Sequence, residues 1–469
     1  MGRASVSYTN KDYESLRREL LDRVPQLTDR WTDFNASDLG VVLLELFCGV
    51  GDMLAYYLDA QAAEAFLPTA RQRQSVINLC KLINYRLDTP VAATTSIRFS
   101  LSAALDADLT IPAGTACRAL LDDGQADFET VEDAIIPRGA LSAQVGARQG
   151  VRKTETFSGT GEPWQKVILS GKAVAQGCLR VCVDGEDWSE VHHFQDSNAD
   201  SPHFLPETDH LDTTAISFGD GKHGAIPANG ADIEVSWLET LGAEGNLAAN
   251  LATNLLDPIY LDGQRVQLSV TNPVPATGGA DREALDHARR QAPAELRALW
   301  KAVTKEDYKA LAEGYPGVAK AEVLDTNDCT NIRYYNVHLA IAPSGGGQPS
   351  PLLKEELAQH LEELKVITVE VNLFDPIYRA IRIDAEVFAW PGEDLDLVRS
   401  RIESGLTDFF AFDQVSFGQS VHFSDIVALL DGTRGVSHVR MYAPQDDIVL
   451  KRGEIPVLGE VHLDMRRAG

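Results

Sequence analysis

The segment from Phe218 to Gly224, FGDGKHG, carries residue types that could do chemistry. Asp220 and His223 lie three residues apart, and such a pair can bind a metal ion or act as acid and base. The glycine spacing differs from the dinucleotide-binding and P-loop patterns, which also need a strand before and a helix after. Three glycines in seven residues are typical of a tight turn in which the aspartate bonds its own backbone. The turn is the favoured interpretation.

A histidine pair and a glycine run are the next candidates. His192 and His193 are adjacent, so on a strand they point to opposite sides and cannot both bind one ion without a kink. The SGGG run at 344–347 lies between a predicted strand and a predicted helix, as a phosphate-binding loop would. No lysine partner follows it and two prolines do, so we expect a flexible connector. The sequence contains no GxSxG nucleophile elbow.

The composition indicates a soluble globular protein. Its 469 residues leave room for two to four domains, and the net charge of −27 disfavours nucleic acid as a partner because phosphates would be repelled. The N-terminal region lacks the apolar core of a secretory signal. Scattered cysteines without a CxxC pair are typical of a reduced, cytosolic protein. The six are Cys48, Cys80, Cys117, Cys178, Cys182 and Cys329.

The element that organises the chain is a long amphipathic helix predicted over 37–66. Ser37 is a good N-cap, and Asp38 places negative charge in the first turn, where the helix dipole favours it. Apolar residues recur at spacings of four and three and form a face wider than a two-stranded seam needs. Glu45, Asp52 and Asp59 lie seven apart and are expected to mark the solvent side. They interrupt the apolar run well short of the ~20 residues of a membrane span.

Two interpretations of this apolar face remain open. It can be core within the chain, which is the commoner fate of such a stripe, or part of it can bind another protein chain. The second interpretation predicts a partner interface made of Leu39, Leu43, Leu46, Phe47, Val50, Leu54 and Tyr57.

The hydrophobic period divides the chain into three predicted domains. Residues 1–90 read as a small N-terminal helical bundle of three helices. Residues 91–270 alternate with period two and predict a mostly antiparallel β domain. Asp184-Gly185 between two alternating runs predicts a hairpin. Residues 280–469 predict a C-terminal α+β region, so the fold class is multidomain α+β.

The C-terminal region shows signs of internal duplication. Residues 307–323 and 425–441 both read as a helix that begins near an aspartate and runs into a Gly-Val strand. Each half also contains a strand followed by a helix, which predicts two ferredoxin-like αβ units. Coincidence is the alternative, because a helix followed by a Gly-Val strand is a common local pattern.

Taken together, these segments resemble the baseplate J-like family of contractile phage tails and contractile injection systems. The resemblance begins with the N-terminal run DYESLRRELLDRVPQLTDRWTDFNASDLG and continues through ISFGDGKHGAIPANGADIEVSW to KEDYKALAEGYPGVAKAEV. Shorter words lie between them: INYRLDTP, LTIPAGT, GNL and NPVPATGGADRE. No single word is diagnostic, but their order and spacing cover nearly the whole chain. The weakest coverage is at 155–212, which looks like an inserted β segment.

The resemblance implies a structural wedge subunit of the baseplate, linking neighbouring wedges into a sixfold ring that holds the sheath until a trigger widens it. The partners it implies are other copies or a second J-like wedge protein, a small sheath-initiator-like subunit, and the central hub and spike proteins. It implies no nucleic acid, membrane insertion, cofactor, metal or catalytic residue, so we expect no enzyme. The expected location is the cytoplasm during assembly, then the baseplate of the virion or injection particle.

Two other functions remain open. The β domain can be a carbohydrate-binding or hydrolytic tail module that uses Asp220, His223 and Trp237. Hydrolysis would need two carboxylates ~5–9.5 Å apart in a cleft, which the sequence cannot show. The chain can also be a scaffold that is present only during assembly.

Overall fold

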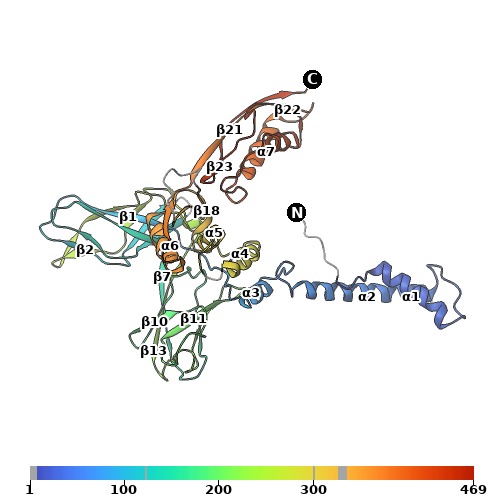
Figure 1. Cartoon of the computed structure of the whole chain (residues 1–469), viewed down its shortest axis with the longest axis horizontal. Coiled ribbons are helices and arrows are strands. Elements are labelled where there is room, and N and C mark those ends of the chain that lie inside the picture. The colour runs from blue at the N-terminus through green and yellow to red at the C-terminus, as the bar shows by residue number, and fades with distance from the viewer. Residues whose placement is uncertain (1–7, 122–123, 299–300, 326–334, 469) are drawn as a thin grey trace. The chain divides into compact units, whose positions relative to one another are not determined.

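The computed structural model describes residues 8–121, 124–298, 301–325 and 335–468 (Figure 1). These residues form two compact units. The first is Met1–Leu87 with Ala284–Ala292, and the second is Asp88–Glu283 with Pro293–Gly469. The first unit is helical and the second is mixed, so the multidomain α+β class with N-terminal helices and a β-rich body is confirmed.

The first two helices of the first unit begin at well-formed caps. Asp12 caps the first helix through a capping box with Ser15. The long helix begins one residue later than predicted, because Asp38 rather than Ser37 is the N-cap and its Oδ1 accepts from the N–H groups of Gly40 and Val41. The helices are α1 (Tyr13–Leu27), α2 (Leu39–Ala63), α3 (Arg73–Lys81) and α4 (Leu285–Ala298), of which residues 285–292 belong to this unit.

The predicted three-helix bundle is wrong. α1 packs along α2, whereas α3 packs against α4 from far along the chain. Val76 and Cys80 of α3 share a buried cluster with Ala288 and Ala292 of α4. α3 therefore finds its apolar partner in α4, whose small alanines admit the larger side chains.

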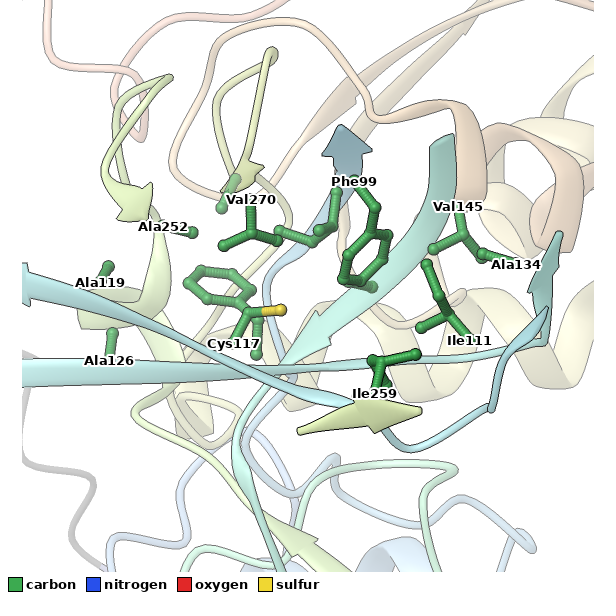
Figure 2. Close-up of a cluster of buried hydrophobic side chains, with 14 of the residues drawn as sticks. Phe99, Ile111, Cys117, Ala119, Ala126, Ala134, Val145, Ala252, Ile259 and Val270 are labelled. Carbon is green, nitrogen blue, oxygen red and sulfur yellow. The ribbon is translucent and has the colours of Figure 1, made fainter. Parts of the chain in front are cut away.

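A six-stranded antiparallel sheet forms the first part of the second unit. Its strand order is β14-β3-β4-β6-β1-β17. Figure 2 shows the core on its inner face, where Phe99 lies among aliphatic side chains from several strands. The strands are β1 (Thr94–Leu101), β3 (Ala116–Leu121), β4 (Gly124–Thr130), β6 (Ser142–Gln149), β14 (Ala252–Leu255) and β17 (Leu268–Thr271), with the short pairs β2 (Leu109–Ile111) with β5 (Ala134–Ile136) and β15 (Ile259–Leu261) with β16 (Gln264–Val266).

A second sheet of seven strands is built from residues 151–239, between β6 and β14. The segment 155–212, predicted as an inserted β segment, lies inside this range. Asp184 and Gly185, both with positive φ, form the predicted hairpin between β9 and β10. In the order β7-β13-β9-β10-β11-β12-β8 the strands are β7 (Val151–Ser158), β13 (Asp232–Glu239), β9 (Arg180–Val183), β10 (Glu186–Glu190), β11 (His203–Thr208), β12 (Thr214–Phe218) and β8 (Lys166–Ile168), and the 3₁₀ turn η1 (Gly242–Gly245) follows.

Two αβ units complete the chain. In each, a central strand pairs antiparallel with one neighbour and parallel with the other. The first consists of α5 (Lys305–Glu313), β18 (Val318–Val323), β19 (Asn336–Pro343), α6 (Pro351–Leu364) and β20 (Glu370–Phe374); the second consists of β21 (Ile377–Ala389), α7 (Leu395–Phe409), α8 (Phe423–Asp431), β22 (Val436–Ala443) and β23 (Glu454–Arg467).

The two αβ units share parts but not their order along the chain. The predicted helix–Gly-Val–strand segments are α5-β18 and α8-β22, with Gly317 and Gly435 at positive φ, and both strands pair antiparallel with the central strand. The first segment precedes its strand–helix partner β19-α6, whereas the second follows β21-α7. Each sheet has three described strands of mixed direction, so the ferredoxin-like prediction is not confirmed.

A candidate protein-binding surface on helix α2

The apolar side chains of α2 are mostly exposed. All seven residues of the predicted partner interface are open to solvent, and Leu39, Phe47 and Tyr57 are about 70% exposed (72%, 71% and 68%). We call this surface the exposed α2 face. It consists of Leu39, Leu43, Leu46, Phe47, Val50, Leu54 and Tyr57, extended by Val42, Met53, Tyr56 and Leu58.

A narrow stripe on the other side of α2 is covered. Val41, Cys48 and Ala55 are buried and lie seven residues apart. Glu45 and Asp52 fall between them, and Asp59 continues the series, so the stripe advances by four and three residues in turn. This spacing keeps all six residues on one side of the helix. Burial of Cys48 raises the pKa of its thiol.

The three acidic residues of this stripe hold the N-terminal segment and α1. Asp59 Oδ1 accepts from the N–H groups of Tyr8 and Thr9, at 3.0 and 2.8 Å. Asp52 Oδ1 accepts from the N–H of Tyr13 at 3.1 Å. The Arg17 guanidinium donates to Glu45 at 2.8 Å, which raises the pKa of Arg17. We call these contacts the acid ladder.

The acid ladder reverses the predicted orientation of α2. The three acids were expected to mark the solvent side, but Glu45 and Asp52 face α1 and Asp59 faces the segment before it, whereas the apolar residues face outward. The physical reason is that the N-terminal segment and α1 offer N–H and guanidinium donors at matching positions. A carboxylate accepts a stronger hydrogen bond from such donors than a neutral acceptor does. The heptad spacing of the acids was visible in the sequence, but the donors include backbone N–H groups, which carry no sequence signal.

Glycines allow α1 and its following loop to approach α2 closely. A Cβ on Gly51 would come within 2.9 Å of Leu16 Cδ1. A Cβ on Gly40 would lie 2.4 Å from the Trp31 ring, whose Nε1 donates to Asp38 Oδ1 at 3.1 Å. Sequence reasoning missed both contacts, because a glycine inside a helix shows only that a side chain is absent.

α1 leaves the exposed α2 face uncovered because it buries little apolar surface of its own. Among its residues only Val24 is buried. A contiguous apolar surface of this kind marks a site of interaction with protein or lipid. α2 is the one helix in the described ranges whose length and composition would let it cross a membrane, and only 17% of that window is buried. Crossing would carry the charged α1 into lipid, at a cost of several kcal/mol per charge.

The candidate chemical residues do not form a site in the β domain. Asp220 Oδ1 accepts from the N–H groups of His223 and Lys222, at 2.7 and 2.9 Å, which lowers the pKa of Asp220. This is the tight turn that the glycines predicted. Trp237 is 1% exposed and lies in the core of the seven-stranded sheet, so it cannot stack on a ligand. Within the described ranges no three His, Cys, Asp or Glu side chains are placed to hold a metal ion.

Three segments match known families of baseplate domains. Residues 12–82 match the bacteriophage baseplate protein N-terminal domain, residues 301–373 match the baseplate J-like central domain, and residues 381–464 match the baseplate J-like protein C-terminal domain. These segments correspond to α1–α3, to the first αβ unit and to most of the second. Three such domains on one chain define the class, a multidomain baseplate protein. These three matches support the assignment of the chain to the baseplate J-like family.

Curated relatives carry related names. The chain is 24% identical over 394 residues to the baseplate wedge protein gp6 of Enterobacteria phage T4, covering 76% of this chain and 57% of that protein. It is 25% identical over 238 residues to the phage-like element PBSX protein XkdT of Bacillus subtilis (strain 168), covering 48% and 65%. The chain therefore spans less than two thirds of the length of either relative.

Solved baseplate structures show a distant likeness. A chain of the anti-feeding prophage baseplate aligns over 97% of this chain and 92% of its own length, with 15% identity and a TM-score of 0.36. A chain of the type VI secretion system TssK-TssF-TssG baseplate subcomplex aligns over 71% and 96%, with 8% identity and a TM-score of 0.32.

Proposed function

We propose that the chain is a structural wedge subunit of the baseplate of a contractile phage tail or contractile injection system. In this role it links neighbouring wedges into a sixfold ring around the hub and couples the trigger to sheath contraction. The observation that carries the proposal is the exposed α2 face in a chain with three baseplate domains. The name of the phage T4 relative, a baseplate wedge protein, supports the same assignment.

The exposed α2 face fits an assembly contact. Obligate interfaces resemble a domain core cut in half, and this face has the aromatic and aliphatic side chains of such a core. The exposed α2 face covers most of the helix circumference outside the stripe that α1 covers, so neighbouring subunits can approach α2 from more than one direction. A ring needs heterologous contacts that close on themselves, and a chain with separate modules can supply two different surfaces.

The partners that we propose are other copies of the chain or a second J-like wedge protein, a small sheath-initiator-like subunit, and hub and spike proteins. Nucleic acid is disfavoured by the net charge of −27. We place the chain in the cytoplasm during assembly and in the finished baseplate afterwards. The role requires no turnover, cofactor or metal. Burial of Trp237 removes one of the three residues on which the carbohydrate-binding alternative depended.

The test introduces a charge on the exposed α2 face. Leu43→Asp and Leu54→Asp should abolish incorporation into particles, because an unpaired carboxylate in a packed apolar interface costs several kcal/mol. Both side chains are exposed, 48% and 59%, so the isolated variants should unfold within ~1 kcal/mol of the parent chain. Incorporation is measured by quantitative mass spectrometry of purified particles.

Val41→Asp is the matched control, because Val41 is on the same helix and fully buried. It should destabilise the isolated chain itself. The proposed interface is contradicted if the Leu43 and Leu54 variants enter particles of normal sheath length. If these two variants unfold like Val41→Asp, the face is core within the chain and the interface proposal also fails. Absence of the unmodified chain from mature particles would indicate the assembly scaffold instead.

A further inference from the structure

Three parts of the second unit meet at residues 344–350, the loop between β19 and α6. Gly345, Gly346 and Gly347 all have φ near +80°, a conformation that other residues rarely adopt. We call these three residues the glycine saddle. The run was predicted to be a flexible connector, but contacts from two neighbouring domains hold it.

The six-stranded β domain contacts one side of this loop. Thr277 Oγ1 donates to the carbonyl of Gln348 at 3.0 Å, and the hydroxyls of Thr94 and Ser350 are 2.6 Å apart in a buried position. A Cβ on Gly345 would lie 2.8 Å from Asn246 Nδ2. The absence of a side chain therefore lets the β domain approach the backbone.

The second αβ unit contacts the saddle through two aromatic residues. The Tyr378 hydroxyl donates to the carbonyl of Gly347 at 2.8 Å. The Phe412 ring packs over Gly346, where an added Cβ would be 3.5 Å away. Phe412 and Tyr378 also pack beside a small buried cluster of Ala342, Val415 and Ile455, which joins the two αβ units.

Lys320 of β18 binds the segment 412–415, which contains Phe412. Its ammonium donates to the carbonyls of Phe412 and Val415 and lies 4.5 Å from the centre of the Phe412 ring. The segment follows the C-terminus of α7, where the helix dipole favours a cation. Burial lowers the pKa of Lys320, and the acidic groups that act on it are Asp413 and Glu313.

Among the described residues, the two αβ units also meet through an ion pair and a close approach at Gly453. Arg452 Nε lies 3.5 Å from Asp325 Oδ2, and a Cβ on Gly453 would meet Leu324 at 3.1 Å. Exposed ion pairs of this kind contribute little stability. The half-buried ammonium of Lys320, with two carbonyls and one ring as partners, is the more specific contact.

We propose that Lys320 is a latch that fixes the second αβ unit on the first, with the Phe412 ring seated between the ammonium and the glycine saddle. While the latch is closed, the β domain and the two αβ units behave as one rigid body, because all three contact the same loop. Release of Lys320 frees the second αβ unit to reorient about the 374–377 connection. In a baseplate this would be the joint at which a trigger changes the shape of the subunit. That consequence rests on the proposed function, but the latch itself does not.

The test compares two lysine variants of the full chain. Lys320→Met removes the ammonium and keeps an apolar stem of similar length. Lys309→Met is the matched control, because Lys309 lies in the same αβ unit but pairs with Glu322 at 2.9 Å, on β18 of that unit. Spin labels attached through unnatural amino acids at positions 358 and 404, exposed sites on α6 and α7, report the distance between the units.

The latch predicts a single narrow distance distribution for the parent chain and for Lys309→Met, and a broad or shifted one for Lys320→Met. Amide hydrogens of 411–417 should exchange about tenfold faster in Lys320→Met, the size expected when charge-assisted hydrogen bonds are lost. Phe412→Ala should reproduce both effects. A broad distribution in the parent chain, or a narrow one in Lys320→Met, would overturn the latch. Since this test uses the isolated chain, its outcome is independent of incorporation into particles.

Discussion

At the scale of single residues, the packing of the N-terminal helices depends on which glycines of α2 face a neighbour. Gly40 lies under the Trp31 ring, whereas nothing lies within 4 Å of a Cβ built on Gly49. Two glycines of the same helix therefore have different roles. One is required by a contact, and the other only weakens the helix.

Gly49→Ala should stabilise α2 by about 0.5–1 kcal/mol, since alanine is the better helix former and its methyl meets open space. Gly40→Ala should instead displace Trp31 and break its bond to Asp38. Hydrogen exchange of the amides in 39–63 measures both effects. Exchange that slows equally in the two variants would show that Trp31 does not need the space over Gly40.

A second residue-scale prediction concerns the cap of α8. His422 Nδ1 lies 3.0 Å from Asp447 Oδ2, and the Asp447 carboxylate also accepts from the N–H of Phe423 at 2.8 Å. The hydrogen bond to Asp447 raises the pKa of His422 above 6.5, and the same bond lowers the pKa of Asp447 below 3.8.

The pair therefore stabilises the cap over a defined pH window. The contribution of His422 is complete below its unfolded pKa of 6.5 and is lost as the pH rises through the higher folded pKa. The contribution of Asp447 is present above 3.8 and is lost as the pH falls through the lower folded pKa. NMR titration of the His422 ring should give a pKa above 6.5 that falls in Asp447→Asn. An unchanged pKa in this variant would exclude the pairing.

At the scale of elements, the acid ladder sets the register of α1 on α2. Asp52→Asn and Asp59→Asn replace charged acceptors by neutral ones, which form hydrogen bonds about half as strong. We expect each to weaken the docking of α1 by about 1 kcal/mol and to speed amide exchange over 13–27. Asp22→Asn, an exposed change on α1 itself, is the control. Equal exchange in all three variants would mean that the ladder does not hold α1.

The same elements show how much the sequence could predict. The spacing of apolar residues located α2 to within three residues at each end, because helical periodicity is a local property. It also identified which side chains share a face. It did not show which face is covered, because the apolar residues and the acids both repeat at helical spacing. The donors to the acids lie in α1 and the segment before it, and their position against α2 is a tertiary contact. Asp184-Gly185 was predictable for the opposite reason, because the hairpin is complete within four residues.

In the C-terminal region, the sequence predicted the local segments but not their arrangement in the sheets. The helix–Gly-Val–strand pattern identified α5-β18 and α8-β22, because the positive φ of Gly317 and Gly435 is a local requirement. The position of each strand in its sheet depends on pairing across the chain. The two units reach the same pairing from different orders of their parts, so similarity of local words did not predict a ferredoxin-like sheet.

At the scale of the whole molecule, the chain carries an exposed helix face in its first unit and, in its second, three domains that contact one loop. In the proposed function the exposed α2 face contacts neighbouring subunits, and the proposed Lys320 latch fixes the second αβ unit on the first. A subunit of this kind can remain attached by one part while another part reorients.

The most direct test of the central claim is hydroxyl-radical footprinting of α2 in the isolated chain and in the assembled particle. Phe47, Met53 and Tyr57 are exposed and reactive, so they should be oxidised in the isolated chain and protected after assembly. Trp237, buried in the chain itself, should be protected in both states. Equal oxidation of the three α2 residues before and after assembly would contradict the claim that protein neighbours cover this face.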